Sequence, residues 1–296
     1  MTTREFVKES LATFYTKLKD IFVKKSEQVI VKGSGSDSAR MKKANSASGS
    51  NSFAEGWDTH AIGNESHAEG YDTTAFRSRS HAEGDTTTAS GSASHAEGGS
   101  TTASGSFSHA EGYSTIASGD YSHAEGYYTS ALTIFSHAEG SGTTASGSCS
   151  HAEGYSARTA GDYSHAEGAE TKALRSFSHA EGFQTIASGQ SSHAEGNTTR
   201  ATGTSSHAEG HGTIASGDFS HAEGFTTSAL TDYSHAEGYG TTASGYASHA
   251  EGDTTKASAN ASHAEGLNTI ASSANQHVQG KLNVEDSAGT YVDIIG

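Results

Sequence analysis

The sequence predicts an all-β solenoid of 14-residue coils with two short strands in each coil, preceded by an N-terminal α-helical coiled-coil segment. A histidine recurs at every fourteenth position from His67 to His277 without insertion or deletion. Each unit divides into two halves of seven residues, one of which contains Ala-Glu-Gly and the other Ala-Ser-Gly. A Ser or Thr lies two residues before the Ala of each half. Only 32% of the residues are hydrophobic and 36 are Gly, so the composition excludes a large aliphatic core. A fixed short period then predicts coils that stack on one another.

A coiled coil is the alternative architecture, because one period of the repeat has the length of two heptads. Glycine at every seventh position in most units, together with the scarcity of leucine, excludes that alternative. Phe53 has the phase of the histidines, which brings the number of repeats to 17. Two parallel sheets with a rise of about 4.8 Å per coil then predict a rod of about 80 Å.

Side-chain alternation along a strand predicts which residues lie inside each coil. In Ser66–Gly70 the His and the Glu share one face, and the Ser and the Ala share the other. The position equivalent to residue 74 includes Arg158 and Lys172, so that side must be outside and the Ala and Ser/Thr side inside. We expect the inner hydroxyls to bond to one another or to the backbone from coil to coil. Thr159 replaces the inner alanine in one unit.

The chain outside the repeats divides into three segments. Residues 1–25 are predicted to form an amphipathic helix, with a capping-box pattern at Thr2 and Glu5. Its apolar residues follow a coiled-coil spacing, which requires partner helices: Val7, Leu11, Phe14, Leu18 and Ile21. Residues 26–51 form a transition, 52–280 the repeats, and 281–296 a C-terminal strand or cap.

Charge and targeting signals restrict the partners. Residues 1–43 have a net charge of +5 and the remainder −21, and an acidic body argues against nucleic acid. The single cysteine, Cys149, excludes an intrachain disulfide. Charged residues interrupt the apolar stretch that a signal peptide would need, and no run reaches transmembrane length. We therefore expect no membrane span, no signal peptide, and export by lysis, a dedicated machine or a carrier particle.

The Ser-His-x-Glu units suggest two kinds of chemistry. A Ser-His-acid triad is disfavoured because neighbouring Ser and His point to opposite faces, so we expect no enzyme, no catalytic residue and no cofactor. His and Glu on one face could instead bind Zn²⁺ or Ni²⁺ or form a hydrogen-bonded ladder that sets chain register. The metal candidates are His67, Glu69, His81, Glu83, His95 and Glu97. Stacked imidazoles about 5 Å apart also predict sensitivity to acid.

Aromatic residues gather at the two turns of the coil, where they are expected either to stack along the rod and between chains or to form an exposed sugar- or surface-binding stripe. Cys149 occupies one of these corner positions. The row after Glu-Gly comprises Tyr113, Tyr127, Tyr155, Phe183, Phe225 and Tyr239. The row before Ser-His comprises Phe107, Tyr121, Phe135, Tyr163, Phe177, Phe219 and Tyr233.

The repeat Ser-His-Ala-Glu-Gly followed by Ala-Ser-Gly resembles the head repeats of YadA-like trimeric adhesins, whose signature is Ser-Val-Ala-Ile-Gly plus Ala-x-Gly. The resemblance covers roughly residues 45–280. It implies a left-handed parallel β-roll, three of which associate about an axis as a homotrimer. The family's Val and Ile positions are His and Glu here, so the wall between chains would be polar.

The tail, Gln276–Gly280 and then Tyr291–Gly296, resembles the segment that precedes a self-cleaving chaperone domain in phage appendage proteins. The resemblances together imply a structural or adhesive trimeric fibre outside the cell: a phage tail fibre, a phage-like particle or a cell or spore surface appendage. The N-terminal helix would trimerise the chain and dock it to the particle, and the rod would act as a spacer that binds a cell-surface or carbohydrate receptor. The alternatives are a precursor or fragment of a self-cleaving protein and a metal- or carbohydrate-binding module.

Overall fold

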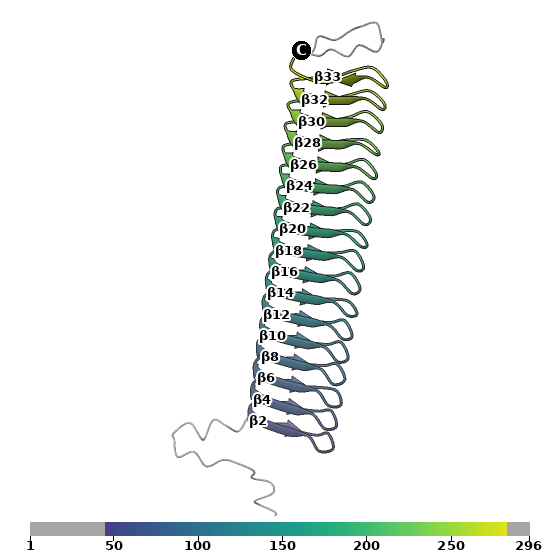
Figure 1. The fold of residues 1–296 in the computed structure, drawn as a ribbon. Coiled ribbons are helices and arrows are strands. Elements are labelled where there is room, and N and C mark those ends of the chain that lie inside the picture. The colour runs from purple at the N-terminus through teal and green to yellow at the C-terminus, as the bar shows by residue number, and fades with distance from the viewer. Residues whose placement is uncertain (1–44, 283–296) are drawn as a thin grey trace, which may run out of the picture. The chain divides into compact units, whose positions relative to one another are not determined.

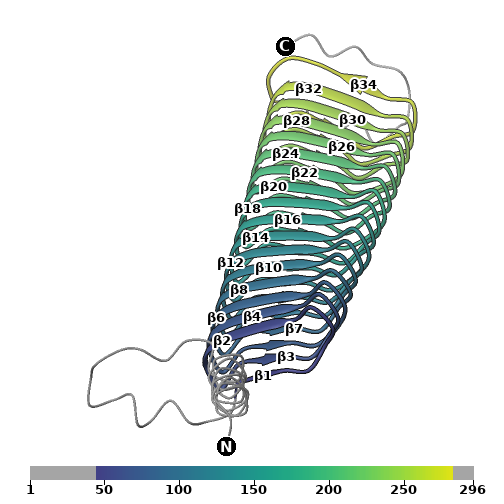
Figure 2. The same cartoon turned by 90° about the horizontal axis from the view of Figure 1, so that it is seen from below.

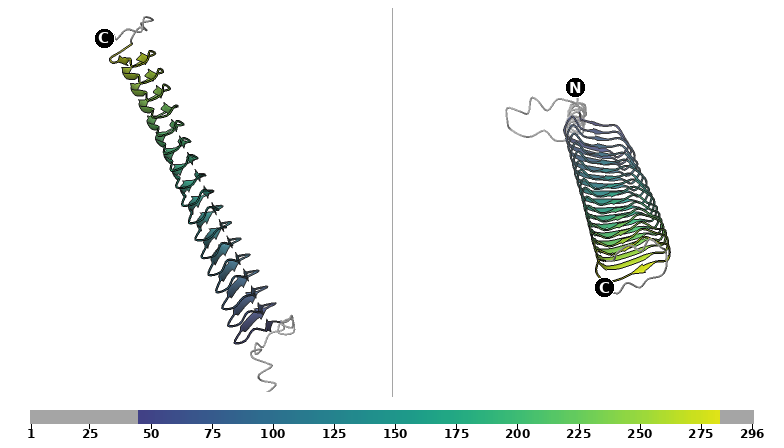
Figure 3. Two further views of the ribbon diagram at one scale, coloured as in Figure 1. Left: turned by 90° about the vertical axis from the view of Figure 1, so that its right-hand side faces the viewer. Right: turned by 90° about the horizontal axis from the view of Figure 1, so that it is seen from above.

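The computed structural model describes residues 45–282, which form a parallel β-solenoid that contains no helix (Figure 1). Each coil consists of one five-residue strand and one two-residue strand separated by two tight corners. The coils follow one another in chain order along the rod, and this order is visible from the other directions shown in Figure 2 and Figure 3. The predicted all-β solenoid with two strands per coil is confirmed.

The even-numbered strands carry the Ser-His-Ala-Glu-Gly half of each repeat. Their bounds are β2 (Phe53–Trp57), β4 (His67–Tyr71), β6 (His81–Asp85), β8 (His95–Gly99), β10 (His109–Tyr113), β12 (His123–Tyr127), β14 (His137–Ser141), β16 (His151–Tyr155), β18 (His165–Ala169), β20 (His179–Phe183), β22 (His193–Asn197), β24 (His207–His211), β26 (His221–Phe225), β28 (His235–Tyr239), β30 (His249–Asp253), β32 (His263–Leu267) and β34 (His277–Val278).

The odd-numbered strands carry the other half and are shorter. Their bounds are β1 (Ser46–Ala47), β3 (His60–Ala61), β5 (Thr74–Ala75), β7 (Thr88–Ala89), β9 (Thr102–Ala103), β11 (Ile116–Ala117), β13 (Ser130–Ala131), β15 (Thr144–Ala145), β17 (Arg158–Thr159), β19 (Lys172–Ala173), β21 (Ile186–Ala187), β23 (Arg200–Ala201), β25 (Ile214–Ala215), β27 (Ser228–Ala229), β29 (Thr242–Ala243), β31 (Lys256–Ala257) and β33 (Ile270–Ala271).

Every strand pairs in parallel with the equivalent strand one coil away, so each residue lies beside its own equivalent in the neighbouring repeats. His109 therefore lies beside His95 and His123, and Glu111 beside Glu97 and Glu125. Pairing begins at β1, where Ala47 lies beside Ala61, and this is earlier than the predicted boundary at residue 52. The reason is that Ala47 already has the phase of the repeats, so its backbone continues the sheet.

The interior of each coil is narrow and holds only small side chains. From Ala61 to Ala271 the alanines of both strands are fully buried, as are the Thr and Ser residues two positions before them. This arrangement confirms the predicted inner face of Ala, Ser and Thr. Because each buried alanine contributes only one methyl group, the continuous backbone ladder of the two sheets contributes much of the cohesion between coils.

Most inner hydroxyls do not bond to one another or from coil to coil as expected. Most of the serines donate within their own coil, as Ser66 Oγ does to the carbonyl oxygen of Gly63 at 2.6 Å. Most inner threonine hydroxyls, including that of Thr73, have no hydrogen-bond partner in residues 45–282. For these hydroxyls the expectation was wrong, because the corner brings a carbonyl next to the serine, while stacked threonines are separated by a full coil spacing; Thr159 and Ser150, which bond to each other, are the exception.

The predicted helix of 1–25, most of the predicted transition and nearly all of the C-terminal cap lie outside the described residues. At the C-terminal end of the solenoid, Lys281 forms a parallel bridge with Leu267. No helix long and apolar enough to cross a membrane occurs between residues 45 and 282.

Candidate functional site

The outer face of the even-numbered strands forms a polar wall along the solenoid, which we call the His/Glu wall. It consists of the histidines from His67 to His277 and the glutamates from Glu69 to Glu265, one of each in almost every coil. Most of these side chains are half-buried, and strand alternation places them opposite the buried Ser and Ala. The prediction that His and Glu share one face is confirmed.

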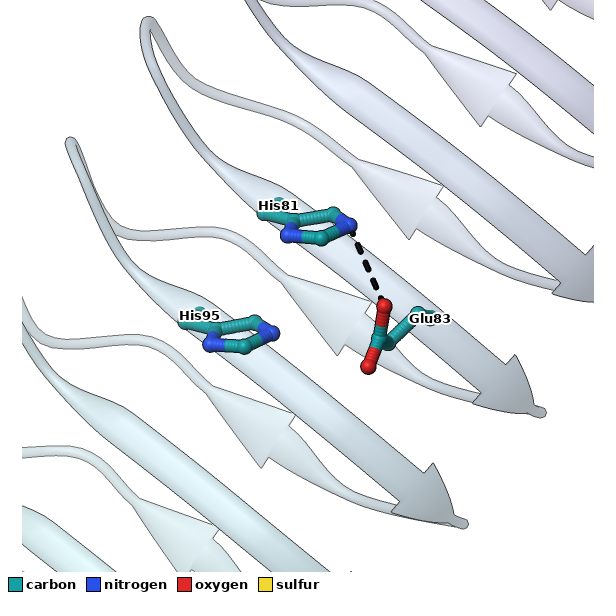
Figure 4. Close-up of side chains that lie close together, drawn as sticks. All are labelled: His81, Glu83 and His95. Atoms are coloured by element: carbon teal, nitrogen blue, oxygen red, sulfur yellow. Dashed lines mark ion pairs between the residues drawn. The ribbon is translucent and has the colours of Figure 1, made fainter.

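The histidines of the His/Glu wall form one continuous stack. Successive ring centroids are 4.5–4.9 Å apart, and most rings are close to parallel, as for His81 and His95 at 1°. This spacing follows the repeat between paired strands. Figure 4 shows His81 and His95 stacked, with Nε2 of His81 directed along the strand toward Glu83.

Each histidine from His67 to His263 faces the glutamate two residues later, across a gap longer than a hydrogen bond. The distance from Nε2 to the carboxylate oxygen is 3.5 Å for His81 and Glu83 and varies from 3.4 Å for His235 to 4.0 Å for His207 along the wall. Hydrogen bonds from nitrogen to oxygen are usually about 2.7–3.2 Å long. The predicted hydrogen-bonded ladder is therefore not closed within a single chain, although each His and Glu form a close electrostatic pair.

The Nε2 atoms are shielded from solvent and have no hydrogen-bond partner in the described part of the chain. Burial, followed by the charge of the neighbouring imidazoles, lowers the pKa of ten wall histidines below the usual value of 6.5. They are His81, His95, His123, His137, His151, His179, His193, His221, His249 and His263. The nearby glutamates oppose this effect only in part. These imidazoles are therefore mainly neutral at pH 7.

The structure brings the predicted metal candidates together in overlapping groups. The ligand atoms of His81, Glu83 and His95 lie within 4.8 Å of one another, and those of His95, Glu97 and His109 do the same. His67 and Glu69 continue the same rows, with 3.7 Å between Nε2 and the carboxylate. Two imidazoles and one carboxylate form a donor set that Zn²⁺ accepts. Three such side chains can therefore act on one ion without rearrangement of the backbone.

The Ser-His-Glu triad is not assembled within a coil. Ser66 points into the interior and is 2% exposed, while His67 lies on the outer face beside Glu69. The serine hydroxyl already donates to the carbonyl of Gly63. Ser66 therefore cannot transfer its proton to the histidine that follows it.

The aromatic row before Ser-His stacks along one corner of the solenoid. Phe107 and Tyr121 lie 5.0 Å apart, and Tyr121 and Phe135 lie 5.1 Å apart. Tyr163 and Phe177 form a separate pair. The rings are about half exposed, but each stack covers the inner ring faces. A sugar ring would therefore contact ring edges along the row and free faces only where a stack ends.

Backbone strain at this corner is a feature that the sequence analysis missed. Phe107, Tyr121 and Phe135 have φ angles of 59°, 57° and 56°, a left-handed conformation that is uncommon for bulky residues. At the other corner the left-handed residues are mostly small or polar, such as Ser114 and Gly142. The exact seven-residue spacing between the two corners is the signal that could have revealed it.

A second missed feature is an acid or amide side chain that clamps successive coils. Asp120 Oδ1 accepts the backbone N–H of Ser106 at 2.7 Å, and Asp218 Oδ1 accepts that of Thr204 at 2.7 Å. Asn64 does the same for Ser50. Each acceptor lies one full repeat after its donor, so Asp or Asn recurring at this phase in the sequence is the signal for the clamp.

Comparison with known protein families gives one match. The family model of the YadA head domain repeat matches residues 110–132, 180–206 and 236–255. No curated protein matches the chain at a significant level. The three matched segments each contain whole strands of the solenoid and share the phase of the unmatched coils between them. The match and the parallel β-solenoid together fit YadA-like head repeats.

Proposed function

We propose that this protein is a structural and adhesive fibre in which three left-handed rolls associate as a homotrimer outside the cell. The observation that carries the proposal is the uninterrupted stack of YadA-like head repeats from β1 to β34. Such a stack has an extended surface and a backbone ladder along its whole length. These properties suit a rigid spacer that presents a binding surface away from its point of attachment.

The setting we favour is a phage tail fibre, a phage-like particle or a surface appendage. The basic, heptad-patterned segment of 1–25 would trimerise the chain and dock it to a particle or baseplate. Support for this part comes from the sequence alone. The alternative, a self-cleaving precursor, is supported only by the resemblance of Gln276–Gly280 and Tyr291–Gly296 to the segment before a chaperone domain.

The His/Glu wall is the face we propose for contact between chains. It is the broader of the two sheets, and most of its side chains are already half-buried in a single chain. The opposite wall carries Arg158, Lys172 and Arg200, which are exposed and suit contact with water. A shared polar wall would let glutamates of one chain pair with histidines of another.

Mass measurement tests the assembly. Light scattering on the full chain should give three times the chain mass of 30.3 kDa, and this mass should persist on dilution. A protein that keeps the mass of a single chain at all concentrations would refute the trimer.

A pair of charge reversals tests the face. Glu153→Lys with Glu167→Lys places two cations in the middle of the His/Glu wall, and Arg158→Glu with Lys172→Glu reverses two charges on the opposite wall. We expect the first variant to lose the trimer mass and the second to keep it, with circular dichroism as the check on folding. Dissociation by the second variant alone would assign the interface to the other wall.

A further inference from the structure

The carboxylates of the His/Glu wall lack a cationic partner of the usual kind. Each wall glutamate from Glu69 to Glu265 faces a histidine, and no lysine or arginine pairs with these glutamates in the described residues. The row places one negative charge in every coil at the sheet spacing of about 4.8 Å. A line of like charges at this density is destabilised unless cations neutralise it.

The gap between each histidine and its glutamate has the size that a bound ion needs. Zinc lies about 2.0–2.1 Å from nitrogen and about 2.0–2.2 Å from oxygen, so two ligands of a tetrahedral ion lie about 3.4 Å apart. The observed Nε2–oxygen distances are 3.5 Å for His81 and 3.4 Å for His235, at the short end of a range that reaches 4.0 Å at His207. These separations are longer than a usual hydrogen bond, and the shortest of them match the edge of a zinc tetrahedron.

We propose that the His/Glu wall binds a row of divalent transition-metal ions such as Zn²⁺. Each ion is held by Nε2 of two successive histidines and by the carboxylate of the first coil, as in the group of His81, Glu83 and His95. Imidazole with carboxylate is a donor set for zinc and its neighbours in the first row. The fourth position of the ion is left for water.

The need for two histidines per ion limits how many ions the His/Glu wall binds. Each Nε2 has a single lone pair, so His95 can serve the ion of His81 or the ion of His109, but not both. The His/Glu wall has 16 histidines, from His67 to His277. Because each ion needs two of them, a chain binds at most eight ions. The ions occupy alternate gaps, about 9.6 Å apart at the sheet spacing.

Binding also requires a small movement of the rings. Two ligands of one ion cannot be farther apart than twice the bond length, about 4.2 Å, while the ligand atoms of a group lie within 4.8 Å. Two histidines that share an ion must lean toward each other, which widens the gaps on either side. This movement strengthens the preference for alternate gaps, and the half-exposed side chains have room for it.

The test compares two variants of the full, untagged chain that have the same composition. Both carry eight His→Gln changes, and all glutamates are kept. The alternating variant leaves no two successive histidines, with changes at His81, His109, His137, His165, His193, His221, His249 and His277. The block variant leaves eight successive histidines, with changes at His179, His193, His207, His221, His235, His249, His263 and His277.

Zn²⁺ titration by calorimetry and Co²⁺ absorption then count the ions and report four-coordinate geometry. We expect up to eight ions for the unchanged chain, up to four for the block variant and at least a tenfold weaker affinity for the alternating variant. Circular dichroism verifies that both variants keep the solenoid. Equal binding by the two folded variants would show that single histidines bind the metal and would overturn the paired site, as would the absence of binding to the unchanged chain.

Discussion

Gly98 and Gly99 are adjacent glycines with different structural roles. Gly98 has a φ of 106°, and a Cβ atom there would lie 2.1 Å from the carbonyl oxygen of Gly112 in the next coil. A Cβ at Gly99 would contact only the ring of Tyr113, at 3.0 Å. The equivalent of Gly99 in the next coil is Tyr113 itself, so that position accepts a side chain. The repeated glycine is therefore required by the close approach of two backbones, whereas its neighbour is not.

We expect Gly98→Ala to destabilise the coil by more than about 3 kcal/mol, because neither the positive φ nor the clash with backbone can relax. Gly99→Ala is the matched control and should change stability by less than about 0.5 kcal/mol. Hydrogen exchange measured on peptides that cover β8 and β10 would report both values. Similar protection in the two variants would contradict the assigned role of Gly98.

In the coil that contains β17, two inner residues are exchanged relative to the other coils. Other coils place Thr before Ala on the odd-numbered side, but here Ala157 takes the threonine position and Thr159 the alanine position. Both are fully buried. Thr159 Oγ1 donates to Ser150 Oγ at 2.9 Å, across the interior, whereas Thr143 Oγ1 in the preceding coil has no hydrogen-bond partner among the described residues. One coil thus satisfies a hydroxyl that its neighbours leave unpaired.

Replacing each hydroxyl by a methyl group should have opposite effects in the two coils. Thr143→Val removes a buried, unpaired hydroxyl and should stabilise the protein by about 1 kcal/mol. Thr159→Val removes a hydrogen bond and leaves Ser150 with one partner fewer, so it should destabilise by about 1 kcal/mol. Denaturant unfolding of both variants against the unchanged chain measures the difference. A change of the same sign in both would mean that packing, rather than hydrogen bonding, decides the effect.

The stacked histidines couple the stability of the solenoid to pH. Burial and the neighbouring imidazoles lower the pKa of His95, His137 and His151 below 6.5. Below that pH the folded chain therefore binds fewer protons than the unfolded chain. The free energy of unfolding then decreases as the pH is lowered. The stabilisation that comes from the neutral histidines is complete above about pH 6.5. It is lost as the pH falls from there through the folded-state pKa values.

Thermal melts of the unchanged chain, recorded with a chelator to remove metal ions, should therefore show a falling Tm between about pH 7.5 and 4.5. The alternating His→Gln variant removes half of the ladder and all contacts between successive imidazoles, so its Tm should fall less. A flat profile for the unchanged chain would reject the coupling. An equal fall in both proteins would assign the acid sensitivity to groups other than the stacked histidines.

The sequence by itself determined the period, the two strands of each coil and the face on which each side chain lies. These properties follow because strand alternation has a period of two and the repeat never changes in length, so His95 must lie beside His81 and His109. The buried Ala, Ser and Thr and the shared face of His and Glu could be predicted for the same reason. The candidate metal residues could likewise be placed in one row.

Only the tertiary structure decided what these residues do to one another. The gaps of 3.4–4.0 Å between His and Glu and the unpaired hydroxyl of Thr143 cannot be derived from the repeat. Each depends on the angle at which the chain turns between strands, and that angle is set by the backbone contacts of adjacent coils together. A periodic sequence specifies which atoms are neighbours, while their separations come from the packed coils.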